Sequence, residues 1–212
     1  MIEVENISKW YADFRVLSEC TTRVDKGEVV VVCGPSGSGK TTLLYCLSAL
    51  EKITEGKIFL DGEEVSKYTE KGIADLRKTS LGFIFQFYNL IPNLTVYENI
   101  LLARIIAKKD NDNILDMLDL VGLKDFKDYY PNQLSGGMQQ RVAIARALIN
   151  NPKIIFADEP TGNLDQKNGR EIMELLTKLN KEKNVTIVLV THNEDYIDYC
   201  SKVIRLLDGR VV

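Results

Sequence analysis

A glycine-rich turn gives the clearest chemical signal in this sequence. The stretch GPSGSGKTT, residues 34–42, fits the pattern G-x-x-x-x-G-K-[ST], in which backbone N–H groups, a lysine and a hydroxyl surround phosphate groups. The three glycines let the backbone turn with its N–H groups pointing inward, which makes an anion-binding concavity. We expect Lys40 to reach the β- and γ-phosphates and the hydroxyl of Thr41 to ligate Mg²⁺. The predicted nucleoside triphosphate site consists of Gly34, Pro35, Ser36, Gly37, Ser38, Gly39, Lys40, Thr41 and Thr42.

A pair of adjacent acidic residues gives a second signal. In KIIFADEP, residues 153–160, an apolar segment typical of a buried strand ends in Asp158 and Glu159. Two carboxylates then lie at the carboxyl end of a strand, where α/β sheets bind their ligands. We expect Asp158 to hold Mg²⁺, directly or through water, and Glu159 to polarise a water molecule aligned on the γ-phosphate. The alternative is two solvated loop acids, which the phosphate-binding turn upstream disfavours.

A third segment, QLSGGMQQRVAIARAL at residues 133–148, places a hydroxyl and two glycines directly before a helical pattern. Ser135, Gly136 and Gly137 therefore predict a helix N-terminus with free N–H groups, which is a second site suited to phosphate. Because one active site does not need two cradles for one γ-phosphate, we expect this segment to close over nucleotide held by a second copy of the chain. The alternative is an ordinary capped helix with glycines at its start.

The elements that must position these segments alternate between strands and helices. Asp61-Gly62 and Asp208-Gly209 are typical of hairpin turns, so antiparallel pairs are expected near both ends of the chain. From residue 95 to 150 the pattern is helical, with apolar residues at i, i+3 and i+4. The expected strands are Ile2–Asn6, Val29–Cys33, Lys57–Leu60, Leu81–Phe85, Lys153–Ala157, Val185–Val190 and Val203–Leu207.

These patterns predict an α/β fold. The core would be a mostly parallel sheet that carries the phosphate-binding turn. An antiparallel β portion at the N-terminus and a helical lobe would be added to it. A chain of 212 residues is long enough for one sizeable core. We therefore expect a single domain over residues 1–212, with the helical lobe at about 88–150 inserted in the α/β core.

Composition and charge exclude several classes of protein. The formal net charge is −3, so the chain lacks the basic field of a nucleic-acid-binding protein. No apolar run approaches the roughly 20 residues that span a bilayer, and the N-terminus has no signal-peptide core. The four cysteines are far apart and lack metal-ligand spacing. A reduced, cytosolic chain is expected.

The order of these motifs resembles the ATP-binding cassette superfamily, the ABC ATPases, over essentially the whole chain. The phosphate-binding turn, LSGGM, IIFADEP, NLD and VLVTHNED follow one another as they do in that family. The resemblance implies that Tyr11 stacks on adenine, with Trp10 a weaker candidate. It also implies that Gln86 senses Mg²⁺ and the attacking water, and that His192 contacts the γ-phosphate. Residues 163–165 would form the loop that crosses to the other protomer.

The resemblance also assigns residues that contact the ATP of the partner copy. One of them departs from the family pattern, because Met138 stands where the signature normally has glutamine. A thioether cannot replace the hydrogen bonds of an amide, so contacts from this side to nucleotide are expected to be weaker. The residues expected to act in trans are Ser135, Gly136, Gly137, Met138 and Asp165.

Within the superfamily, the sequence is most similar to the ATP-binding subunit of a transporter. It has no long coiled coil and room for only one cassette. The stretch ADEPTGNLDQK is similar to the branch that serves lipoprotein release, macrolide export and cell division, whereas the N-terminal residues look closer to polar amino-acid importers. We favour the first branch, and a soluble P-loop kinase is the alternative from another class. The resemblance implies ATP and Mg²⁺ as cofactors, a second copy and an integral membrane permease as partners, and a location on the inner face of the membrane.

The stretch FIFQFYNLIPNL, residues 83–94, starts as a strand and stays apolar through a loop. A loop is normally polar, so these residues either pack into the core or cover a docking cleft. We favour docking of a short helix from the membrane chain, with Leu90 and Ile91 as contacts.

Overall fold

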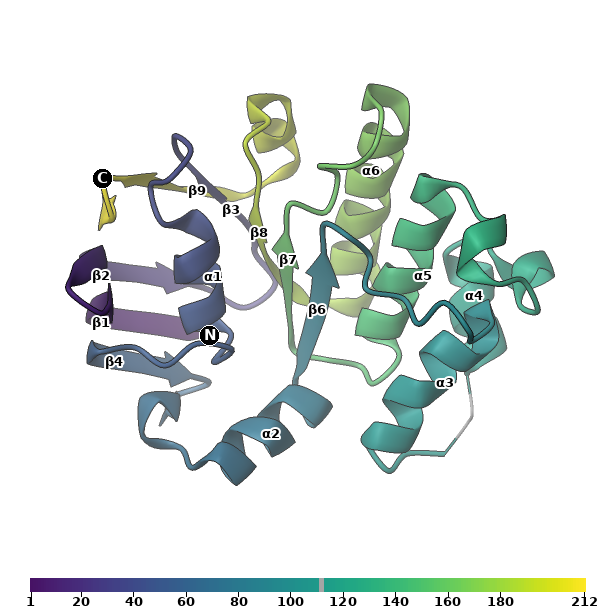
Figure 1. The fold of residues 1–212 in the computed structure, drawn as a ribbon, viewed down its shortest axis with the longest axis horizontal. Helices are drawn as coiled ribbons and strands as arrows, with labels where there is room; N and C mark the ends of the chain where they lie inside the picture. The colour runs from purple at the N-terminus through teal and green to yellow at the C-terminus, as the bar shows by residue number, and fades with distance from the viewer. Residues whose placement is uncertain (111–112) are drawn as a thin grey trace.

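The computed structural model describes residues 1–110 and 113–212 and contains two sheets (Figure 1). A six-stranded sheet has the order β10-β9-β3-β8-β7-β6, and a four-stranded sheet has the order β2-β1-β4-β5. The strands are β1 Ile2–Tyr11, β2 Phe14–Val24, β3 Val29–Cys33, β4 Glu55–Leu60, β5 Glu63–Glu64, β6 Leu81–Phe85, β7 Ile154–Asp158, β8 Thr186–Val190, β9 Lys202–Leu207 and β10 Arg210–Val211. The α-helices are α1 Lys40–Leu47, α2 Glu70–Thr79, α3 Val96–Ile106, α4 Ile114–Leu120, α5 Gly136–Leu148 and α6 Gln166–Lys183. Short 3-10 helices are η1 Val65–Lys67, η2 Lys124–Phe126, η3 Pro131–Gln133 and η4 Glu194–Tyr199.

The six-stranded sheet is parallel except for its edge strand β10, and it is covered on both faces. Successive side chains of β3 point to opposite faces, as the pleat requires. Val31 packs in a cluster with residues of α3 to α6, whereas Val30 and Val32 pack with α1 and the antiparallel sheet. The central strands are therefore apolar on both faces, which explains the run of valines before the phosphate-binding turn.

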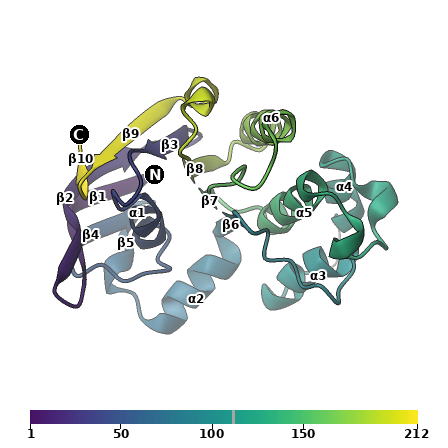
Figure 2. The ribbon, with the colours of Figure 1, turned by 45° about the horizontal axis from the view of Figure 1, so that its top comes forward.

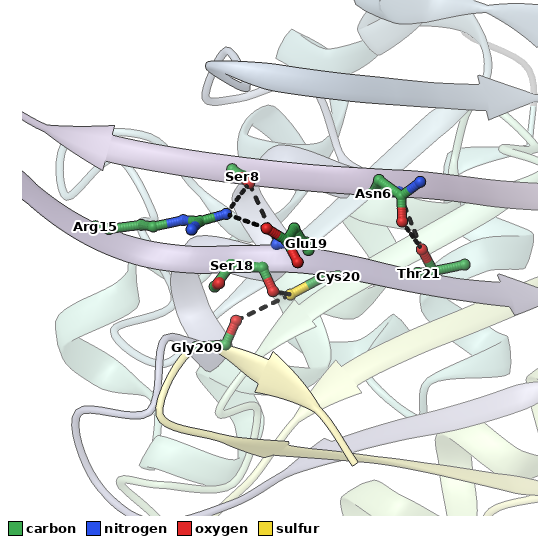
Figure 3. A network of polar contacts seen from close by, with 8 residues as sticks. All are labelled: Asn6, Ser8, Arg15, Ser18, Glu19, Cys20, Thr21 and Gly209. Atoms are coloured by element: carbon green, nitrogen blue, oxygen red, sulfur yellow. Dashed lines mark hydrogen bonds and ion pairs between the residues drawn. The ribbon is translucent and has the colours of Figure 1, made fainter.

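The antiparallel sheet is irregular where β1 pairs with β2. Asn6 and Glu19 adopt left-handed backbone angles, φ 48° and 52°, and the register shifts beside them. Side chains stabilise these bulges: Thr21 donates to Asn6, and Ser8 Oγ accepts from the Arg15 guanidinium (Figure 3). In the same network Cys20 Sγ donates to the carbonyl of Gly209, which connects β2 to the turn between β9 and β10.

The helices α3, α4 and α5 lie together at the end of the molecule opposite the antiparallel sheet (Figure 2). Thr95 starts α3 with a capping box, since its hydroxyl accepts from the N–H of Glu98 and the Glu98 carboxylate accepts from the N–H of Thr95. No strand occurs between 95 and 150 among the described residues, as the helical pattern predicted. In the described part of the chain, no helix is long and apolar enough to cross a bilayer.

The predicted fold class is confirmed, and two of the predicted strands, β3 and β6, have the predicted bounds. The antiparallel pairs expected at Asp61-Gly62 and Asp208-Gly209 are present as β4–β5 and β9–β10. The prediction missed β2 altogether and ended β1 five residues early. These two long strands alternate between buried and exposed positions and are interrupted by bulges, so neither gives a continuous apolar run.

Candidate active site

The phosphate-binding turn connects β3 to α1 and needs glycine at specific positions. Gly34 and Gly39 have φ of 152° and 97°, in the region that side chains rarely adopt. A Cβ on Gly34 would lie 2.0 Å from the carbonyl oxygen of Leu206, and one on Gly39 would lie 3.0 Å from Leu17. The turn is therefore enclosed by β2 and β9 on its outer side. Gly39 directly precedes Lys40, the first residue of α1.

Two polar groups of the turn fit an anionic ligand. Lys40 is only 8% exposed, and its ammonium donates to the carbonyl of Pro35 over 2.8 Å. The hydroxyl of Ser38 is buried and has no hydrogen-bond partner in the part of the chain that the structure describes. A buried cation, a hydroxyl without a partner and the N-terminus of α1 thus face one small region. Such a set favours bound phosphate.

The two adjacent acids both face this region because of an unusual backbone conformation. Asp158 ends β7, and its Oδ1 accepts from the hydroxyl of Thr41 over 3.0 Å. Glu159 follows with φ of 46°, a left-handed conformation that is rare outside glycine. In a regular strand the two side chains would point to opposite faces. The left-handed conformation of Glu159 breaks this alternation, and such strain is typical of functional sites.

Tyr45 is a site residue that sequence reasoning missed. Its hydroxyl donates to Asp158 Oδ2 over 2.9 Å. Burial and, second, the hydrogen bond to Asp158 together raise the pKa of Tyr45 to about 12, so the phenol is protonated at neutral pH. The available signal was spacing, since Tyr45 follows Thr41 by four residues and helical residues four apart share a face.

Glu159, His192 and Gln86 lie around the turn that follows β7. Glu159 Oε2 and His192 Nδ1 are 2.9 Å apart. A Cβ on Gly162 would meet the side-chain nitrogen of Gln86 at 2.7 Å and Glu159 Oε2 at 3.1 Å, so both side chains approach the same glycine. Asn163 donates to the backbone carbonyl of Gln86 over 2.9 Å. The structure therefore places the side chains of Glu159, His192 and Gln86, three of the four residues predicted to be catalytic, around one turn.

The residues predicted to act in trans lie on separate elements. Ser135 starts α5 and accepts from the N–H of Met138 over 3.3 Å, so the predicted helix N-terminus is present. Met138 packs against the main apolar cluster, where a thioether is well suited, and this accounts physically for its apolar character. Asp165 starts α6 by accepting from the N–H of Asn168, and this bond holds the pKa of Asp165 below its usual range.

Tyr11 ends β1 on the side of the antiparallel sheet, together with its neighbour Trp10. The ammonium of Lys9 lies 4.8 Å from the centre of the Tyr11 ring and pairs with Glu51 at 2.8 Å. The Trp10 ring lies beside the Arg15 guanidinium instead. Tyr11 is partly exposed, and its role toward adenine stays a prediction.

The apolar stretch 83–94 contains both residues that pack against the core and residues that are exposed, as a docking surface requires. Leu90 is partly buried and packs against the main apolar cluster, whereas the large apolar side chains of Phe87 and Ile91 are exposed. This contact favours the packing interpretation for Leu90, and docking of a partner helix at Leu90 and Ile91 stays a prediction. A groove of about 410 Å³ lies next to this stretch, between α2 and β6 on one side and α3 and α5 on the other. We name it the α2–α5 groove; it is lined by Arg77, Lys78, Leu81, Gly82, Phe83, Phe85, Asn89, Ala103, Ile106, Arg146, Ala147 and Asn150.

The fold and the site define a class. A parallel sheet with a phosphate-binding turn after one strand, β3, and paired acids after β7, which is separated from β3 by β8, is the arrangement of a P-loop nucleotide hydrolase.

Comparison with known proteins gives the family. The ABC transporter family model matches residues 17–162. The chain is 44% identical over 216 residues to the lipoprotein-releasing system ATP-binding protein LolD of Aquifex aeolicus, covering 100% of this chain and 96% of the relative. It is 43% identical over 215 residues to the macrolide export ATP-binding/permease protein MacB of Bdellovibrio bacteriovorus, covering 99% of this chain and 33% of the relative. The solved dimer of the ATP-binding cassette MJ0796, in a post-hydrolysis state bound to ADP and Pi, matches with a TM-score of 0.90 and 40% identity, covering 100% of this chain and 96% of that chain.

The chain belongs to the ABC transporter family. It is an ATP-binding and ATP-hydrolysing subunit of the lipoprotein-release and macrolide-export type. This confirms the predicted branch and sets aside the alternative of a soluble P-loop kinase.

Proposed function

We propose that two copies of this chain enclose two ATP molecules, each bound by the phosphate-binding turn of one copy and the N-terminus of α5 of the other. The observation that supports this most is the separation of the two phosphate-binding helix ends within one chain. Among the described residues, no hydrogen bond joins Ser135, Gly136 or Gly137 to residues 34–42. The dimer of the related cassette MJ0796 is consistent with a two-copy assembly.

In this proposal the first residues of the site neutralise phosphate charge. The Lys40 ammonium leaves the Pro35 carbonyl and donates to the β- and γ-phosphates, and the N–H groups of residues 34–39 surround them. Thr41 and Asp158 are the oxygen donors that would hold Mg²⁺, with Gln86 beside them, and hard oxygen donors suit this ion. When bound, Mg²⁺ supplies charge that stabilises the developing negative charge on the phosphate oxygens.

The remaining residues act on the attacking water and the γ-phosphate. The carboxylate of Glu159 accepts a proton from the water as the water approaches phosphorus. His192, in contact with Glu159 at 2.9 Å, keeps that carboxylate in position and contacts the γ-phosphate. Gln86 and Asn163 hydrogen-bond to each other. A shift of Gln86 on binding of the γ-phosphate therefore moves Asn163 and the loop that contacts the partner copy. Tyr11 stacks on adenine, and Ser135 and the two glycines that follow it donate to the γ-phosphate of the partner's ATP.

The α2–α5 groove is the proposed contact with an integral membrane permease at the inner face of the membrane. Apolar side chains line it, Phe83, Phe85 and Ile106 among them, and Ile106 is half-exposed. The groove lies between the α/β core and the helices α3 and α5, so any change in their relative position changes its shape. A segment of the permease bound there would interact differently with the two nucleotide states, as coupling requires.

A mixing experiment tests whether the sites form between copies. Lys40→Ala removes the positive charge that neutralises the phosphates in one half-site, and Ser135→Arg, at an exposed position, blocks the other half-site. Each variant alone should hydrolyse no ATP. In a mixture, heterodimers regain one intact site, so activity should return to about a quarter of the wild-type value if copies pair at random. Sites formed within one chain would leave the mixture inactive, because both variants would then be defective in every site.

A further inference from the structure

The carboxylate of Asp158 is held on both of its oxygens by one face of α1. Oδ1 accepts from the hydroxyl of Thr41 over 3.0 Å, and Oδ2 accepts from the hydroxyl of Tyr45 over 2.9 Å. The two donors are four residues apart on the helix and are therefore neighbours on its surface. In the part of the chain that the structure describes, no other side chain donates a hydrogen bond to this carboxylate.

The two donors have different expected fates when nucleotide binds. Thr41 belongs to the phosphate-binding turn, and its hydroxyl is the predicted Mg²⁺ ligand. Turning toward the metal ends or weakens its bond to Asp158. The Tyr45 hydroxyl, one helical turn further along α1, is free of such a role. Its ring is half-buried and packs against the apolar cluster formed by α1, the antiparallel sheet and the central strands, so its position is set by packing.

We propose that Tyr45 is a positioning residue for Asp158, whose hydroxyl holds the carboxylate in the orientation that receives the magnesium ion of MgATP. The proposal rests on the proposed function, which assigns Asp158 to the metal. Tyr45 is not itself a ligand. Its hydrogen bond connects α1 to the end of β7, so it fixes the position of the Asp158 carboxylate relative to the phosphate-binding turn that precedes α1.

The direction of the effect follows from two opposing contributions. A hydrogen bond to a carboxylate draws electron density from its oxygens and weakens them slightly as ligands. It also fixes their orientation, and loss of such outer partners typically lowers metal affinity by about 10–100-fold. Orientation is therefore the larger contribution, and removing the hydroxyl should weaken metal binding.

The test uses Mn²⁺ as the probe, because free Mn²⁺ gives an electron paramagnetic resonance signal that disappears on binding. Affinity for Mn²⁺ is measured on the full chain with ADP kept below the protein concentration, so that no excess ADP binds the metal in solution, and affinity for ADP is measured separately in EDTA. Tyr45→Phe, which removes one oxygen atom and keeps the ring, should weaken Mn²⁺ binding about tenfold. Its affinity for ADP without metal should equal that of the wild type. Asp158→Asn should abolish Mn²⁺ binding in the ADP complex, and adding Tyr45→Phe to it should have no further effect.

The chain offers a matched control. Tyr68 also donates its hydroxyl to a carboxylate, that of Glu63, at an exposed position beside the antiparallel sheet. Tyr68→Phe should leave Mn²⁺ affinity unchanged, which separates a local effect on Asp158 from the general loss of a tyrosine–carboxylate bond.

Each outcome decides a different point. Unchanged Mn²⁺ affinity in Tyr45→Phe, together with its loss in Asp158→Asn, overturns the positioning role and leaves the proposed function intact. Unchanged affinity in Asp158→Asn overturns the metal assignment itself. An equal loss of ADP affinity in EDTA would show that Tyr45 shapes the whole turn, which also overturns the proposal. If Tyr45→Phe fails to fold, Tyr45→Met replaces it, and unfolding of both variants would make Tyr45 a core residue only.

Discussion

Arg146 of α5 is predicted to stabilise the loop that follows β6. Its guanidinium donates to the backbone carbonyls of Tyr88 and Asn89 over 2.7 and 2.5 Å. These two residues have φ of 61° and 50°, so two successive side-chain-bearing residues adopt the left-handed conformation. Gln86 lies two residues before this pair. Replacing Arg146 with methionine keeps much of the apolar length and removes both donors, which leaves the strained loop without its hydrogen bonds to α5.

The magnitude follows from the exposure of the two carbonyls. A hydrogen bond from a charged donor contributes about 1.5–3 kcal/mol when buried. The bond to Tyr88 is partly buried, whereas the bond to Asn89 is exposed, so water replaces much of the second one. We therefore expect Arg146→Met to lower the free energy of unfolding by about 2 kcal/mol. For a chain of this size, that corresponds to a fall in Tm of about 4–8 °C.

Thermal unfolding followed by circular dichroism measures this effect, and ATPase activity should fall with it because the position of Gln86 depends on the loop. Arg77→Met is the matched control. Arg77 lines the same α2–α5 groove, but among the described residues its side chain makes no hydrogen bond or ion pair. Its Tm should stay within about 2 °C of the wild type. Equal Tm values for the two variants would refute the reasoning, since the Arg146 bonds would then add nothing to stability.

Three further predictions concern the phosphate site, the groove and the thiols. Lys40→Ala should abolish ATP binding with an unchanged circular dichroism spectrum, and unchanged affinity in calorimetry would contradict this. Ile106→Asp should keep Tm and basal ATPase activity and prevent co-purification with the permease, whereas Leu90→Asp should lower Tm because it places a charge against the core; intact co-purification of Ile106→Asp would refute the groove assignment. Burial raises the pKa of Cys46 to about 12 and that of Cys200 to about 11, so at pH 8 only about one thiol in a thousand or fewer is the reactive thiolate. Iodoacetamide should therefore modify both thiols only after unfolding, and rapid labelling of the folded protein at pH 8 would contradict their burial.

The sequence predicted the elements whose signal is local. The valine run of β3 and the apolar residues of β7 are buried on both faces of a parallel sheet, so their sequence is apolar throughout. Ser135 followed by two glycines predicted the start of α5, because helix capping depends only on residues that are neighbours in the sequence. The segment FRVLSECTTRV of β2 alternates with polar residues and contains the bulge at Glu19, so periodicity alone did not indicate it.

The features of the site that the sequence did not predict depend on tertiary contacts. Tyr45 acquires its role only because β7 ends opposite the same face of α1. The left-handed conformation of Glu159, which lets both acids face the site, has no sequence signal in a residue other than glycine. Leu90 and Phe87 belong to one apolar stretch, and only the three-dimensional packing shows that the first is inside and the second outside.

We propose that ATP holds two copies of this chain together through sites shared between them. Glu159→Gln keeps the side-chain size and removes the carboxylate that accepts the proton from water, so ATP should bind without being hydrolysed. Light scattering of this variant with saturating ATP and Mg²⁺ should show a stable dimer, and quantification of bound nucleotide should show two ATP per dimer. The same variant with ADP should be monomeric. A Glu159→Gln chain that binds ATP and stays monomeric at every protein concentration tested would contradict the account.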